Sequence, residues 1–300
     1  MSSSSSPPSP VDEKQFEATG ATSSHGAASN DSGRLHALEQ LEILPQILNE
    51  GILFAGSGAA LLLQAAWPAI RETEPPQGGH KALATELIEA LQTHISYIST
   101  LVFGTQAERK ALIALLQRDD APGLDGGRNN RFAHHPELKL WMAATLYATA
   151  TDFYQRVYGR VDYQTAQHGY AEFTLLISYL GVPPGMWPET RQAFWSYWDN
   201  QISRLTVSKD AAAFARDLHE STKMPGWVQR LKPFLKAVMV EMLPPKLRDA
   251  YGLRSTRSTR FLYRSWMGFA TAVYPAMPNK VRSYPLRYYQ DRMKEQLNVV

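Results

Sequence analysis

The chain has 300 residues, of which 44% are hydrophobic and 11% aromatic, enough to build one large core. It contains no cysteine, which excludes disulfides, thiolate metal sites, iron–sulfur clusters and cysteine nucleophiles. Lys and Arg number 31 against 28 Asp and Glu. This net charge of +3 is too small to indicate a nucleic-acid partner or to favour binding to an anionic membrane.

The first 33 residues are rich in Ser, Pro, Ala, Gly and Thr and contain almost no large apolar side chains. Such a segment buries too little apolar surface to offset the entropy of ordering, so we expect a disordered tail over residues 1–33. The start carries neither a secretory signal nor a lipidation motif, which favours a cytoplasmic protein. Nothing marks a domain boundary in residues 34–300, so we expect one domain there.

From Leu35 onward, apolar residues recur at helical spacing, and no run of strict alternation is long enough to suggest a strand. The sequence therefore predicts an all-α fold, a single large helical bundle. Stretches rich in Gly with Pro, Asp or Asn predict surface loops over residues 74–79 and 119–131. Apolar periodicity predicts helices around residues 173–180, 194–202 and 231–242.

Three local signals predict where helices begin. Thr105 and Glu108 form the Thr-x-x-Glu pattern of a capping box. Pro136 and Pro188 suit the first position of a helix, because the N–H that proline lacks would have no partner there. We therefore expect helices to run over residues 137–158 and 189–202.

The segment from Ile52 to Ile70 is long enough to imitate a membrane span. It contains Gly, Ser and Gln and ends at Trp67-Pro68, which favours a buried core helix instead. Its Gly56-Ser57-Gly58 lacks the third glycine and the preceding strand of a dinucleotide-binding fingerprint. These glycines are more typical of close helix packing.

Motifs of other enzyme classes are absent from the sequence. The eight histidines show neither the His-Glu-x-x-His spacing of a zinc site nor the Glu-x-x-His pairs of a di-iron bundle, so we expect no metal site built from the protein alone. No Gly-x-Ser-x-Gly elbow supports a serine hydrolase. Glu172 lies on a predicted helix whose other face is apolar, where a half-buried carboxyl could act as an acid or base. An ordinary surface glutamate is the alternative reading.

Four segments carry a resemblance to a known family. Residues 58–68 end in Leu-Leu-Gln-Ala-Ala-Trp-Pro, residues 97–105 end in Val-Phe-Gly-Thr, and residues 135–146 read His-Pro-Glu-Leu-Lys-Leu-Trp-Met-Ala-Ala-Thr-Leu. The fourth runs from Tyr170 to Thr190, with an echo of the family's last helix over 243–253. In this order they resemble the MpaB/rubber-oxygenase family of helical haem proteins, and the chain is similar to a divergent member of the fungal natural-product type. The resemblance implies that family's helical-bundle fold for residues 34–300.

The resemblance also implies a haem b held by an axial histidine, but the sequence departs from the family at its histidines. Trp67 and Ala143 stand where the family has histidine, and the axial position falls on Arg118. A guanidinium that stays protonated has no lone pair for iron, so Arg118 is not an axial ligand. His94, on the facing helix, is then the candidate axial ligand. Arg118 would pair with a haem propionate or a substrate carboxylate.

Three functions follow from the resemblance and these departures. The first is an oxidoreductase, an oxygenase-like tailoring enzyme of secondary metabolism, acting on an apolar small molecule. Its pocket would be lined by Trp67, His94, Arg118, Trp141 and Thr145, with Thr145 also contacting the cofactor. The second is a haem-free cyclase or isomerase that uses Arg118 and Glu172. The third is a non-catalytic binding protein.

Overall fold

The computed structural model describes residues 33–68, 80–117, 135–220 and 226–297. The predicted disordered tail and both predicted loops lie wholly or almost wholly outside these ranges. The chain divides into two compact units, Met1–Gln40 and Leu41–Val300. In the first unit, residues 33–39 form a helix. Everything below concerns the second unit.

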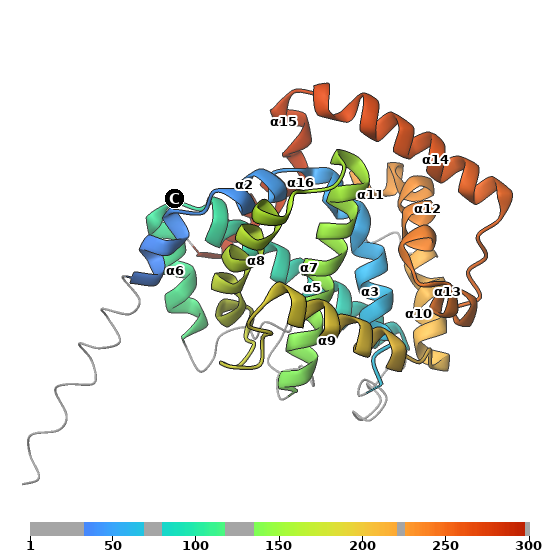
Figure 1. Cartoon of the computed structure of the whole chain (residues 1–300), viewed down its shortest axis with the longest axis horizontal. Helices are drawn as coiled ribbons and strands as arrows, with labels where there is room; N and C mark the ends of the chain where they lie inside the picture. The colour runs from blue at the N-terminus through green and yellow to red at the C-terminus, as the bar shows by residue number, and fades with distance from the viewer. Residues whose placement is uncertain (1–32, 69–79, 118–134, 221–225, 298–300) are drawn as a thin grey trace, which may run out of the picture. The chain divides into compact units, whose positions relative to one another are not determined.

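The second unit is built from helices, and no strand occurs in the part of the chain that the structure describes, so the predicted all-α fold is confirmed. Figure 1 shows these helices. The elements are α2 (Ile43–Leu48), η1 (Gly51–Gly56), α3 (Ser57–Ala65), α5 (His80–Phe103), α6 (Gln106–Leu116), α7 (Pro136–Tyr158), α8 (Tyr163–Ile177), η2 (Ser178–Leu180), α9 (Arg191–Arg204), α10 (Lys209–Glu220), α11 (Gly226–Arg230), α12 (Lys232–Met242), α13 (Pro245–Ala250), α14 (Arg257–Ala272), η3 (Tyr274–Ala276), α15 (Asn279–Arg282) and α16 (Tyr284–Leu297).

Two of the predicted helix starts are confirmed and one is wrong. The Thr105 side chain accepts from the Glu108 N–H while the Glu108 carboxylate accepts from the Thr105 N–H, the full capping box of α6. Pro136 is the first residue of α7. By contrast, α9 begins at Arg191 rather than after Pro188, because the Thr190 side chain caps it by accepting from the Ala193 N–H at 3.1 Å.

The segment Ile52 to Ile70 is not one helix. It begins as the 3-10 turn η1 and continues as α3, which ends at Ala65. The change falls at the Gly56-Ser57-Gly58 step, where a Cβ on Gly58 would meet Met239 of α12 at 3.2 Å, so α3 and α12 approach closely there. In the described part of the chain, no helix is both long and apolar enough to cross a bilayer.

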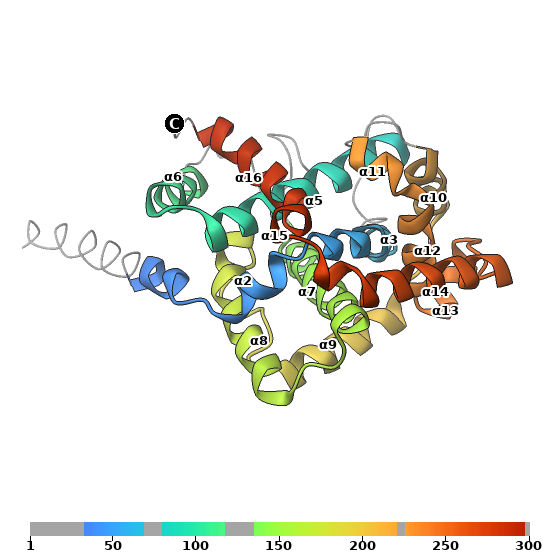
Figure 2. The same cartoon turned by 90° about the horizontal axis from the view of Figure 1, so that it is seen from above.

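The short helix α3 lies at the centre of the packing. Its residues from Ala59 to Ala65 are buried all round. It packs against α7, α12 and α5, while α5 also packs against α10 and α16. Figures 1 and 2 show α3 beside α7, with α14 at the periphery against α12. A core cluster joins η1, α7, α12 and α14 through Leu53, Phe153, Val238 and Met267.

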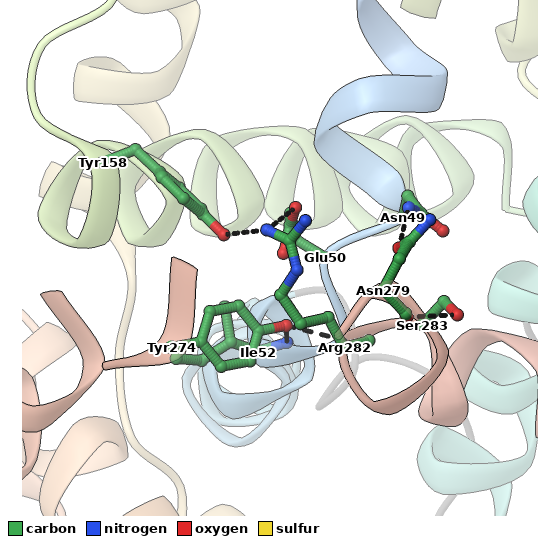
Figure 3. A network of polar contacts seen from close by, with 8 residues as sticks. All are labelled: Asn49, Glu50, Ile52, Tyr158, Tyr274, Asn279, Arg282 and Ser283. Atoms are coloured by element: carbon green, nitrogen blue, oxygen red, sulfur yellow. Dashed lines mark hydrogen bonds and ion pairs between the residues drawn. The ribbon is translucent and has the colours of Figure 1, made fainter. Parts of the chain in front are cut away.

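A polar network fastens the C-terminal helices to the start of η1 (Figure 3). Arg282 donates to the buried Glu50 carboxylate at 2.8 Å and to the Tyr158 hydroxyl at 3.4 Å. The Tyr274 hydroxyl accepts from the Ile52 N–H at 3.1 Å. Between these contacts Gly51 lies so close to the Arg282 carbonyl oxygen and the Pro285 ring that no side chain fits.

We predict that Gly51→Ala lowers the free energy of unfolding by about 2 kcal/mol, because the methyl group would push the Arg282–Pro285 backbone away. Gly268→Ala in α14 is the matched control, since a Cβ there meets nothing within 4 Å. We expect the control to raise stability by about 0.5–1 kcal/mol through helix propensity. Urea denaturation of both variants measures the difference, and equal values would contradict the close approach.

Candidate functional site

Three largely apolar cavities lie around η1, and Phe54 lines all of them. Cavity A, of about 400 Å³, lies between η1, α3, α5 and α12. Cavity B, of about 130 Å³, lies between α2, η1, α5, α7 and α8. Cavity C, of about 280 Å³, lies between η1, α12, α14 and the C-terminal helices. The volume of cavity A is within the usual range for a small-molecule site.

Phe54 is the wall that the three cavities share. Its ring stacks on Tyr289 of α16, with centroids 5.4 Å apart and planes 2° from parallel. Ser57 and Ile95 also line both cavity A and cavity B. Phe54, Ser57 and Ile95 therefore lie on the border between cavities A and B.

The lining of cavity A combines apolar walls with a few polar groups. Its walls include Leu61, Leu91 and Met239, whereas Lys232 and Lys236 of α12 also border it. Lys236 is exposed and Lys232 half-buried, and neither makes an ion pair among the described residues. An apolar molecule with an acidic group could therefore bury its hydrocarbon part in cavity A and pair its negative charge with a lysine of α12.

His94 is fully buried on α5 and has one unused nitrogen. Its Nδ1 lies 2.6 Å from the Ala90 carbonyl oxygen, and because a carbonyl oxygen only accepts, Nδ1 carries the proton. Nε2 is buried without a hydrogen-bond partner in the described structure. Burial lowers the pKa of His94 to about 4, and the Ala90 hydrogen bond partly opposes this while Lys139 adds to it. The ring is therefore neutral at pH 7 with a free lone pair.

That lone pair suits an axial haem ligand, whose other nitrogen is usually fixed by a backbone carbonyl in this way. None of the three cavities, however, is lined by His94. The cavity-facing residues Leu91, Gln92 and Ile95 lie on average about a quarter turn from His94 around α5. The candidate iron donor and the cavities therefore occupy different faces of one helix.

Thr145 and Trp141 of α7 are brought together, but at the seam with α3 rather than in a cavity. The Thr145 hydroxyl accepts from Gln64 Nε2 at 2.8 Å and donates to the Met142 carbonyl oxygen at 2.8 Å. The Trp141 indole N–H donates to the Leu63 carbonyl oxygen at 3.2 Å, and its ring stacks on Trp198. Both side chains fix helices to each other.

Trp67 and Arg118, the other predicted pocket residues, are placed differently. Trp67 is buried just after the end of α3, and its backbone N–H donates to the Gln64 carbonyl oxygen. It lines none of the three cavities. Arg118 lies outside the described residues, so its predicted role stays a prediction.

Glu172 is buried on α8 and holds the start of α2. Its carboxylate accepts the backbone N–H groups of Glu42 and Leu44, each at 2.7 Å, and that of Ile43 at 3.0 Å. His168 Nε2 lies 3.4 Å from Oε1. Glu172 thereby satisfies the first N–H groups of a helix that has no side-chain cap of its own. This gives the carboxylate a structural task, and its predicted catalytic role stays a prediction.

Sequence reasoning missed Phe54, Ser57 and Ile95, which line the cavities. No local signal distinguishes an apolar residue beside a cavity from one in a filled core, because both have the same periodicity. Gln64 was also missed, although one amide within Leu-Leu-Leu-Gln-Ala-Ala is an unusual polar residue. Its Oε1 is buried and has no partner in the described structure.

Residues 44–272 match the model of a family described as ER-bound oxygenase mpaB/B'/Rubber oxygenase, catalytic domain. The match covers more than half of the chain, so the chain belongs to this family of oxygenase catalytic domains. The family is generally haem-dependent. Among the residues placed by the structure, no group of three or more His, Asp or Glu side chains is arranged to hold a metal ion.

Two similar proteins are the uncharacterized proteins Rv2237 of Mycobacterium tuberculosis and Mb2261 of Mycobacterium bovis. Each is 32% identical to this chain over 118 residues, which is 39% of this chain and 46% of the relative. The chain thus spans about half the length of the curated relatives it matches. No solved structure matches it.

We predict that Glu172→Gln lowers the free energy of unfolding by about 2 kcal/mol, because the amide NH₂ would face backbone N–H groups that need an acceptor. Glu89→Gln, at an exposed position of α5, is the matched control and should change stability by less than about 0.5 kcal/mol. The melting temperatures of the two variants, each compared with that of the wild type, measure this difference. Equal melting temperatures would contradict the capping role of Glu172.

We predict that, in the haem-free chain, His94 makes stability depend on pH between about 4 and 6.5. In this window the unfolded chain binds a proton that the folded chain does not, so stability is full above pH 6.5 and falls as the pH drops towards 4. The loss of free energy of unfolding between pH 7 and pH 4 should approach about 3 kcal/mol.

Urea denaturation at pH 7 and pH 4 should show a smaller loss of free energy of unfolding for His94→Gln than for the wild type. His135→Gln, a half-buried control, should behave as the wild type, and an unchanged loss in His94→Gln would exclude this role.

Proposed function

We propose that this chain is an oxidoreductase of the oxygenase type whose apolar small-molecule substrate occupies the cavities that meet at Phe54. The observation that carries the proposal is the position of cavities A and B, which are lined almost wholly by residues of the oxygenase catalytic domain. Apolar walls favour an apolar ligand because its burial removes hydrocarbon surface from water, worth roughly 25 cal/mol per Å². By the same family resemblance, we assign it to the tailoring of secondary metabolites.

The substrate class can be narrowed by the polar groups of cavity A. Lys232 and Lys236 supply two cations beside an apolar space, and Gln92 supplies an amide. A long apolar acid matches both the apolar walls and the two cations. Its hydrocarbon chain can lie against the walls, and its carboxylate can pair with either lysine. The buried face of such a ligand would reach Phe54 and Ser57, where cavity A borders cavity B.

His94 supports haem as the cofactor, because its neutral ring offers Nε2 as a buried donor without a competing partner. A bound haem would supply the oxygen or electron-transfer chemistry of the oxygenase class. The contribution of this chain's own residues would be to keep Nε2 free by binding Nδ1 to the Ala90 carbonyl and to keep water out by burial.

One observation favours a second candidate function. His94 lines none of the three cavities, so a ligand in cavity A or B would not lie against Nε2 as the residues are placed. A haem-free cyclase or isomerase, or a binding protein, needs no such contact. In that case the cavity would act through its shape and through the cations of α12.

An absorption spectrum with a pyridine haemochrome assay distinguishes the candidates, using the full chain expressed with added haem precursor. We expect a Soret band at one haem per chain that is lost in His94→Ala, because the axial donor is removed. It should remain in His135→Ala, the matched control. A folded, colourless wild-type protein would contradict the oxygenase proposal and leave the haem-free candidate.

A further inference from the structure

The positive charge of the chain is concentrated in one segment. Residues 250–290 contain no Asp or Glu, whereas the whole chain has a net charge of only +3. The seven basic residues of this segment are Arg254, Arg257, Arg260, Arg264, Lys280, Arg282 and Arg287. The remainder of the chain is therefore net acidic, and the segment carries a local field that the total conceals.

Helix α14 presents much of this charge on its outer face. Its inner face is buried through Met267 and Ala270 against the core. The opposite face carries Phe261, which is 73% exposed, between Arg257 and Arg264. At 100° per residue these three side chains fall within about 60° of one another. An exposed phenylalanine flanked by arginines thus forms an outward-facing stripe on α14. The helix itself lies at the edge of the molecule in Figure 1.

The apolar surface continues from α14 to the C-terminal helices. Phe269, Val281 and Tyr284 are each about half exposed, and all three line cavity C. The mouth of cavity C therefore opens within an apolar patch beside the arginines. Phe54 forms part of the inner end of the same cavity, where it borders cavity A.

We propose that the outer face of α14, together with Phe269, Val281 and Tyr284, docks on the surface of an anionic lipid bilayer. Guanidinium groups pair with lipid phosphates and carboxylates, while Phe261 and Phe269 insert between the acyl chains, as in helices that lie in the bilayer interface. The docking itself does not depend on the proposed function. If both hold, cavity C faces the acyl chains and gives an apolar substrate a dry route towards Phe54.

A basic surface with aromatic side chains could also bind a nucleic acid or a second copy of the chain. The exposed aliphatic side chains and the unbalanced positive charge favour lipid over both. Val281 and Val273 are exposed beside the aromatic rings, and an aliphatic side chain offers a nucleic acid neither a stacking face nor a hydrogen bond. A second copy of the chain would bring the exposed arginines of α14 against the same arginines of its partner, and residues 250–290 supply no acidic side chain to pair with them.

Sedimentation of the full chain with vesicles tests the proposal. We expect binding to phosphatidylcholine vesicles that contain phosphatidylserine, weakening as salt rises, and little binding to phosphatidylcholine alone. The variant Arg257→Gln/Arg260→Gln/Arg264→Gln should lower the partition coefficient roughly 100-fold. Phe261→Ser should lower it roughly tenfold, because one inserted ring is lost.

The matched control Lys110→Gln/Arg160→Gln/Arg204→Gln removes the same charge from exposed positions elsewhere and should bind nearly as the wild type. Circular dichroism establishes that each variant is folded. The proposal is overturned if the wild type ignores anionic vesicles or if the two triple variants weaken equally. It is also overturned if a single-stranded RNA oligomer binds through the same arginines, or if light scattering shows a dimer that Phe261→Ser dissociates.

Discussion

The packing of this fold depends on a helix that is buried on every side. The residues of α3 from Ala59 to Ala65 are all buried, because α5, α7, α10, α12 and η1 pack around it. Two side chains from other helices bind carbonyl oxygens near its end: the Tyr251 hydroxyl donates to that of Leu62, which also accepts from the Ala66 N–H, and the Trp141 indole N–H donates to that of Leu63. Cavities A and B lie beside the start of α3, where Phe54 and Ser57 line both of them.

Much of the fold could be predicted because its signals are local. The capping box at Thr105 and the proline start of α7 each depend on residues within one helical turn. Pro188 failed as a helix start because a stronger cap, Thr190, follows it within two residues. The close approach of Met239 to Gly58 of α3 involves residues about 180 positions apart, which no local pattern encodes.

The candidate site was harder to predict because its determinants are distant in sequence. Glu172 was expected to be half-buried, but its partners are backbone N–H groups about 130 residues away, which no spacing could indicate. The burial of His94 was not evident from periodicity, although its lone pair is its main chemical feature. The uneven distribution of charge was not evident from the net charge of +3 either, since a sum hides the acid-free segment that includes α14.

A ligand in the cavities that meet at Phe54 would shield the side chains lining them, and because the chain contains no cysteine, an introduced thiol can report this directly. Ser57→Cys would place the chain's single thiol at the border of cavities A and B, and its reaction rate with N-ethylmaleimide can be followed with and without dodecanoate. Ser203→Cys, exposed on α9, is the matched control. We predict that dodecanoate slows the reaction at position 57 and leaves position 203 unchanged. Equal rates with and without dodecanoate at both positions would contradict the binding of an apolar ligand in these cavities.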